Sequence, residues 1–241
     1  MSAQLRPFSS VPRALWWLLA LCLLLQVGWQ LSQRSSTAQV QPLPAPPSVA
    51  LARLASLGEP QAMARAMLLH LQAFDDQPGV SLPWRTLDYA HLTGWLATAQ
   101  ALDPRSQYAL LAASTVYTGV ADPARVRRML RFVADSFAQD PQHRWQAMAQ
   151  ATLAARHQLH DLPLARSYAR QLRLQATGPG VPAWVRQMEV FILEDMDELH
   201  SAQLVLGALL ASGQMTDPNE LAFMARRLDE LAARKAAQAG N

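Results

Sequence analysis

The feature that most constrains this chain of 241 residues is an uncharged apolar run from Ala14 to Leu31. Its 18 residues would form roughly 27 Å of helix, which is about the thickness of the hydrocarbon core of a bilayer. Because backbone polar groups in lipid must satisfy one another, a helix is the structure expected for such a run. Polar and apolar residues alternate after Leu31, as is typical of a water-exposed domain. We therefore predict a transmembrane helix over 14–31 that tethers a folded domain.

The charges on either side of this run predict its orientation. Arg6 and Arg13 precede the run without any acidic residue, and Arg34 is the single charge between the run and Arg53. Positive flanking charge is retained on the cytoplasmic side of a membrane. We therefore expect residues 1–13 to form a cytoplasmic tail and the large domain to lie on the other side.

Two alternatives to a retained anchor share this charge order. A cleaved signal peptide could be cut after the small residues at 36–38, but its apolar core is usually only about 7–15 residues long. A lipoprotein would use Cys22, the single cysteine, but Leu21 stands where a small residue is required. The length of the run and its bulky tryptophans favour a single-pass anchor.

Composition then suggests a compartment. Apart from Cys22 the chain has no thiol, so the domain has no disulfide and no thiolate metal site. Neither of the two asparagines, Asn219 and Asn241, begins a glycosylation sequon, and all but one of the 21 basic residues are arginine. These features favour the bacterial inner membrane with a periplasmic domain. A net charge of +3 is too small to indicate nucleic-acid binding.

Proline and capping residues divide the chain into segments. Residues 32–47 contain the sequence QPLPAPP and are expected to form a semi-stiff linker. In the folded domain, Asp-Pro pairs at 103–104, 122–123, 140–141 and 217–218 are typical of helix starts, because Asp accepts first-turn amides and Pro has no amide to leave unpaired. Glu220 would complete a capping box with Asp217. We find no strand or hairpin pattern.

The fold expected from these marks and from apolar stripes at helical spacing is all-α, with a helical domain over 48–236 and a C-terminal tail over 237–241. The expected helices are 14–32, 48–57, 60–74, 85–101, 105–119, 123–138, 142–158, 162–176, 182–197, 200–213 and 218–236.

The spacing of these helices suggests a repeat. Asp103 and Asp140 are 37 residues apart, as are Ala165 and Ala202, and a helix pair that recurs at such a period is typical of a stacked solenoid. The chain resembles the tetratricopeptide repeat family over about residues 105–213. The matching positions are Trp145, Met148, Ala149 and Thr152 for the first helix, and Ala165 with Ala169 and Ala202 with Leu206 for the second. The consensus Gly and Tyr are absent. This resemblance implies antiparallel helix pairs and a protein-binding scaffold.

Two polar clusters are candidates for metal sites. His157, His160 and Asp161, with His143, could bind zinc, but packing and helix capping explain them better. The acidic residues 194–198 could attract calcium, but they lie within a helix that lacks turn-forming residues. We interpret them as a helix face that pairs with arginines. We expect no metal ion and no cofactor.

A basic surface is the candidate for partner binding. Arg125, Arg128 and Arg131 lie away from the apolar stripe of their helix and could contact anionic lipid or an acidic partner, although a solvated helix face has the same pattern. The irregular stretch over 75–84 is a second candidate. No catalytic motif occurs, so we do not expect an enzyme. The expected function is a scaffold or adaptor for another envelope protein, and the alternative is an accessory factor for the assembly or export of an envelope enzyme or polymer.

Overall fold

The structure is a computed structural model, and it describes residues 12–32, 41–77, 80–81, 83, 86–213 and 217–239. The chain divides into two compact units: Met1–Gln41 with Asp76–Ser81, and Pro42–Asp75 with Leu82–Asn241. Across the described residues, regular structure is helical except for two strands of two residues each. The prediction of an all-α chain is thereby confirmed. Residues 1–11 of the expected tail over 1–13, the possible cleavage site at 36–38 and the last two residues of the expected tail over 237–241 lie outside the described residues, whereas residues 237–239 are helical.

The first unit contains the apolar helix. Helix α1 runs from Arg13 to Ser32, and none of its residues is buried. Of the described helices it is the one long and apolar enough to cross a membrane, and a signal sequence near the N-terminus would pass the same test. The unit also holds strands β1 (Asp76–Gln77) and β2 (Val80–Ser81), which pair antiparallel. This short pairing corrects the expectation that the 75–84 stretch contains no strand.

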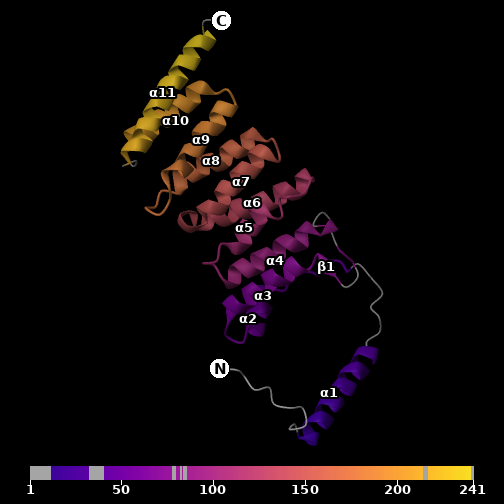
Figure 1. Cartoon of the computed structure of the whole chain (residues 1–241). Coiled ribbons are helices and arrows are strands. Elements are labelled where there is room, and N and C mark those ends of the chain that lie inside the picture. Colours follow the sequence, from indigo (N-terminus) through magenta and orange to yellow (C-terminus); the bar gives the residue numbers. More distant parts are fainter. Residues whose placement is uncertain are drawn as a thin grey trace, which may run out of the picture. The chain divides into compact units, whose positions relative to one another are not determined.

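The second unit consists of ten described helices, and Figure 1 shows them following one another in chain order from α2 to α11. Each helix packs on its neighbours in the chain. Helices two apart also touch, namely α2 with α4, α4 with α6, α5 with α7 and α7 with α9. The helices are α2 (Val49–Ala55), α3 (Pro60–Ala73), α4 (Tyr89–Leu102), α5 (Tyr108–Thr115), α6 (Pro123–Gln139), α7 (Pro141–His157), α8 (Leu162–Gln175), α9 (Ala183–Asp195), α10 (Leu199–Ala211) and α11 (Pro218–Ala239).

Aspartate caps explain several helix starts. The carboxylate of Asp122 accepts from the amides of Ala124 and Arg125, and Asp217 accepts from the amide of Asn219 at 2.9 Å. The other predicted caps differ. Asp140 bonds to His143 rather than to a first-turn amide, and Asp103 ends α4 instead of beginning α5. Glu220 accepts from the side chain of Gln187, so the predicted capping box is replaced by a contact between helices.

The core of this unit depends on small residues. Ala149, Ala165, Ala169 and Ala202 are all buried, and each lies where one helix approaches another. A first apolar cluster extends from Leu43 to Ile192, and a second joins α9 to α10 and α11. Helix α9 contributes to both clusters, which makes it the element that connects them.

The proline-rich segment 42–47 is packed against α4, whereas a semi-stiff linker was expected over 32–47. Leu43 is only 3% exposed, and its carbonyl lies 2.7 Å from Nδ1 of His91. Trp95 Nε1 donates to the Pro44 carbonyl and Thr98 Oγ1 to the Pro47 carbonyl, at 2.9 and 3.1 Å. Proline carbonyls are free to accept because the segment has no ladder of its own. We call residues 42–47 the strap.

Candidate functional site

The acidic residues of α9 and the turn after it are paired with arginines. Glu189 is bonded by Arg173 of α8, and Glu194, whose side chain is 7% exposed, is held by Arg227 and Arg234 of α11. Asp195 accepts from Arg156 at 2.9 Å, and Glu198 accepts from Arg166 at 2.9 Å. These pairs join α7, α8 and α11 to α9. The carboxylates are thus part of the packing between helices, and Glu189 and Glu194 are buried rather than solvated.

The residues of the candidate zinc cluster either make separate local contacts or lie exposed to solvent. Asp161 caps α8 through the Leu164 amide and accepts from Arg127 at 2.9 Å. These two contacts, the Arg127 bond first, hold the pKa of Asp161 below its ordinary value. His157 and His160 are exposed, and His143 bonds to Asp140. Within the part of the chain that the structure describes, no group of three His, Cys, Asp or Glu is placed to hold a metal ion.

The three arginines singled out on α6 have different surroundings. Arg125 pairs with Asp122 at 3.0 Å, and its guanidinium carbon lies 5.3 Å from the centre of the Tyr89 ring. Arg128 and Arg131 are exposed and have no ion pair among the described residues. The structure therefore reduces the free basic surface of α6 from three residues to two.

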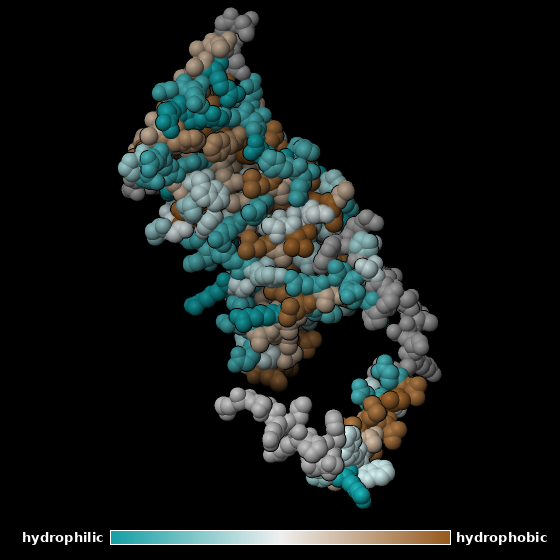
Figure 2. Space-filling view, viewed as in Figure 1, coloured by the Kyte–Doolittle hydropathy of each residue, from teal (hydrophilic) through white to brown (hydrophobic). Residues whose placement is uncertain are grey.

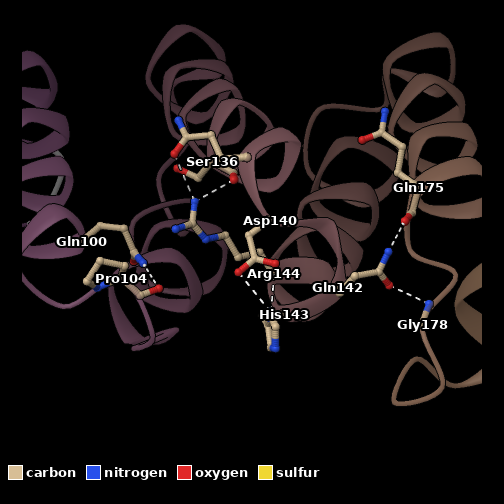
Figure 3. Close-up of polar contacts among 10 residues, drawn as sticks. Gln100, Pro104, Ser136, Asp140, Gln142, His143, Arg144, Gln175 and Gly178 are labelled. Carbon is tan, nitrogen blue, oxygen red and sulfur yellow. Dashed lines mark hydrogen bonds and ion pairs between the residues drawn. The ribbon is translucent and has the colours of Figure 1, made fainter.

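The first turn of α7 fixes the ends of two neighbouring helices, as Figure 3 shows. Buried Arg144 donates to the Ser136 carbonyl at 2.8 Å, near the end of α6. The amide of Gln142 donates to the Gln175 carbonyl at the end of α8 and accepts from the amide of Gly178. Carbonyls at a helix end have no partner within the helix, so these side chains satisfy groups that would otherwise be unpaired. This edge of α7 is structural.

Two hollows lie in successive grooves between odd-numbered helices. The first, of about 370 Å³, lies between α3 and α5 and is lined by Arg65, Leu68, Leu69, Gln72, Ser106 and Tyr108. Gln72 and Tyr108 hydrogen-bond across it. The second, of about 300 Å³, lies between α5 and α7 and is lined by Ser114, Thr115, Gln150, Leu153, Ala154, His157 and Gln158. We call the outward surface of α3, α5, α7 and α9 the odd-helix face.

Apolar side chains are exposed along this face. Leu69 on α3, Tyr108 on α5, Leu153 on α7 and Trp184 on α9 are each more than a third exposed. Trp184 also meets Trp145 of α7 edge to face, with ring centres 5.7 Å apart. Single exposed apolar residues are common on proteins, but Leu69, Tyr108 and Leu153 line hollows that also contain hydroxyl, amide and imidazole groups. Such a combination of apolar surface and polar groups suits the binding of a peptide or helix from another protein.

Sequence reasoning missed this face because its residues have no common motif. Leu69, Tyr108 and Leu153 come from three helices, and each looks like an ordinary core position in its own segment. No pattern in the sequence singles them out, because each stands among other apolar residues of its helix. The comparisons add no further assignment, because the chain matches no protein-family model, no curated protein and no solved structure.

Proposed function

We propose that this protein is a membrane-anchored helical-repeat scaffold that binds a segment of another envelope protein on its odd-helix face. The observation that carries the proposal is the pair of hollows in consecutive grooves, α3–α5 and α5–α7, bordered by exposed apolar side chains. An extended or helical segment that lies along the face would reach both hollows.

A tetratricopeptide-like solenoid is the architecture that we propose for residues 48–236. Its supports are the contacts between helices two apart and the buried alanines at positions where the family has small residues. Helix pairs that stack in this way produce a long surface with the same helix type repeated along it. The odd-helix face would be that surface.

We further propose that α1 is retained in a bacterial inner membrane and that the helical domain lies in the periplasm. The supports are the charge order around α1, its apolar length and the absence of buried residues in it. A phosphatase that is active only after export, fused after Asn241, should be active. Activity of a reporter that works only in the cytoplasm would reverse the orientation.

The partner is proposed to present an acidic segment as well as apolar residues. Arg128 and Arg131 on α6 are exposed and form no ion pair among the described residues, and Arg65 borders the first hollow. Arginine binds carboxylates through paired hydrogen bonds. The alternative function, an accessory factor for assembly or export of an envelope enzyme or polymer, uses the same surface with a transient client.

The test is capture of the partner from crosslinked native membranes by tagged wild-type and variant chains. Leu69→Arg and Leu153→Arg should each reduce capture, because a charge would enter the apolar border of a hollow. Leu204→Arg on α10 is the matched control, since Leu204 is 62% exposed and lies outside the face. Equal capture by all three variants would exclude the odd-helix face. Recovery at fixed stoichiometry indicates a scaffold, and recovery only after crosslinking indicates a client.

A further inference from the structure

Helix α2 has its apolar side chains directed to solvent, the reverse of an ordinary packed helix. Leu51, Leu54 and Leu57 follow one another at three-residue spacing and are 57%, 77% and 93% exposed, whereas Ala52 is the one buried residue of α2. Figure 2 shows apolar surface at the α2 end of the helical unit. We call these three leucines the α2 leucine row. We propose that the α2 leucine row contacts the lipid surface of the membrane in which α1 is anchored.

The backbone turns sharply at the end of the row. Leu57 has a φ of 51° and Gly58 follows with a φ of 97°. His160 and Asp197 have similar φ values just after α7 and α9, so a left-handed residue is the way in which several helices of this chain end. After α2 this turn leaves the Leu57 side chain 93% exposed.

The short connection to α1 identifies lipid as the occupant. Helix α1 ends at Ser32, and the strap fixes the chain to α4 from Leu43 onward through the bonds of His91 and Trp95. Ten residues, 33–42, therefore connect the two, and at ~3.3–3.6 Å per residue they can span no more than about 36 Å. Because the strap leads directly into α2, only a short length of chain separates the leucine row from the anchor.

The side chains around the row have the chemistry of an interfacial helix. Arg53 of α2 is exposed and its guanidinium also donates to the Ala101 carbonyl at 3.5 Å, so it adds positive charge near the leucines that attracts lipid phosphate groups. Glu59 is the exposed acidic residue of this region. An interfacial helix inserts its apolar side chains at the boundary between headgroups and acyl chains. The inference rests on retention of α1, which is part of the proposed function.

The experiment measures the depth of a probe in full-length protein reconstituted in phosphatidylethanolamine–phosphatidylglycerol vesicles. Leu54→Cys in a Cys22→Ser background carries a polarity-sensitive fluorophore, and Leu204→Cys in the same background is the matched control. Brominated lipids should quench the probe at position 54 at least about twofold more strongly than the probe at position 204. The emission of the probe at position 54 should also be shifted to the blue. Replacing Leu51 and Leu57 by Ser should remove most of the difference.

The possible outcomes separate this inference from the proposed function. Wild-type protein labelled at Cys22 reports insertion of α1, so strong quenching at 22 with equal, weak quenching at 54 and 204 overturns the lipid contact alone. A blue shift at 54 without quenching by brominated lipid also overturns it, because a protein surface then covers the row. Absence of quenching at 22 contradicts retention of the anchor and, with it, the basis of the inference.

Discussion

Arg125 and Arg128 are one turn apart on α6, yet the structure gives them different roles. Arg125 is held between Asp122 and the Tyr89 ring, whereas Arg128 extends into solvent together with Arg131. Spacing along the helix predicted that all three arginines avoid the apolar stripe, and that is correct. It could not predict that Arg125 meets Tyr89, because this contact depends on how α4 packs on α6.

We predict that Arg125→Ala destabilises the fold and that the double variant Arg128→Ala, Arg131→Ala does not. The loss of one half-exposed ion pair and one cation–π contact should lower the free energy of unfolding by about 1 kcal/mol. Removal of the two solvent-exposed arginines should change it by no more than ~0.5 kcal/mol. Thermal unfolding of full-length protein in detergent, followed by circular dichroism, measures both. The double variant should nevertheless weaken partner capture, and high salt should weaken wild-type capture in the same way.

The lowered pKa of Asp161 predicts that the stability of the folded protein depends on pH. Arg127 and the Leu164 amide lower its folded-state pKa from the ordinary 3.8, so its contribution is fully present above that value and is lost as the pH falls through the lower folded-state pKa. Asp161→Asn keeps an oxygen for the cap but loses the charge. At neutral pH it should be less stable than wild type by up to ~1 kcal/mol, and Asp161→Ala by ~0.5–2 kcal/mol.

The measurement is urea unfolding at neutral pH and at about pH 3. The difference in unfolding free energy between wild type and Asp161→Asn should narrow at the acid pH. At about pH 3, below the ordinary pKa of 3.8, the carboxyl of the unfolded chain takes up a proton and the folded state loses part of its advantage. A gap that stays constant or widens on acidification would show that the Arg127 contact does not stabilise the folded protein.

At the scale of elements, the helices were largely predictable and their connections were not. The Asp-Pro pairs and apolar stripes placed α6, α7 and α8 within about one residue of their observed ends, because caps and 3.6-residue periodicity are local properties. The strap was predicted as a linker, because its prolines give no sign of the helix that they will contact. The predicted α5 was too long at both ends, because Asp103 ends α4 instead of capping α5 and because the apolar sequence after Thr115 continues into a turn in which Tyr117 is buried.

The packing of the strap on α4 can be tested by comparing alanine substitutions at two glycines. A Cβ at Gly94 of α4 would lie 2.5 Å from Cγ of Pro46, whereas a Cβ at Gly207 of α10 would meet nothing within 4 Å. Alanine is favoured over glycine inside a helix by ~1 kcal/mol. Gly207→Ala should therefore raise the melting temperature and Gly94→Ala should lower it, both measured on full-length protein in detergent. If Gly94→Ala is as stabilising as Gly207→Ala, the strap is not packed on α4.

At the scale of the whole molecule, the sequence was most informative about the class of the protein and least informative about its binding surface. The run from Ala14 to Leu31 and the helical periodicity are continuous in sequence, so they indicated a tethered all-α protein. The hollows between α3, α5 and α7 are formed by side chains from separate helices, and no local pattern encodes them. The basic surface was identified instead because arginines are conspicuous in any sequence.

The central claim is that the odd-helix face binds the partner, and site-specific photo-crosslinking tests it most directly. A photoreactive phenylalanine replaces Leu69, Leu153 or Leu204 in separate full-length chains, which are irradiated in native membranes. Positions 69 and 153 border the two hollows, and position 204 is an exposed leucine on α10 outside the face. The account predicts that one and the same protein is crosslinked from 69 and from 153 and not from 204. Crosslinking of that protein from 204 alone, or equally from all three positions, would contradict it.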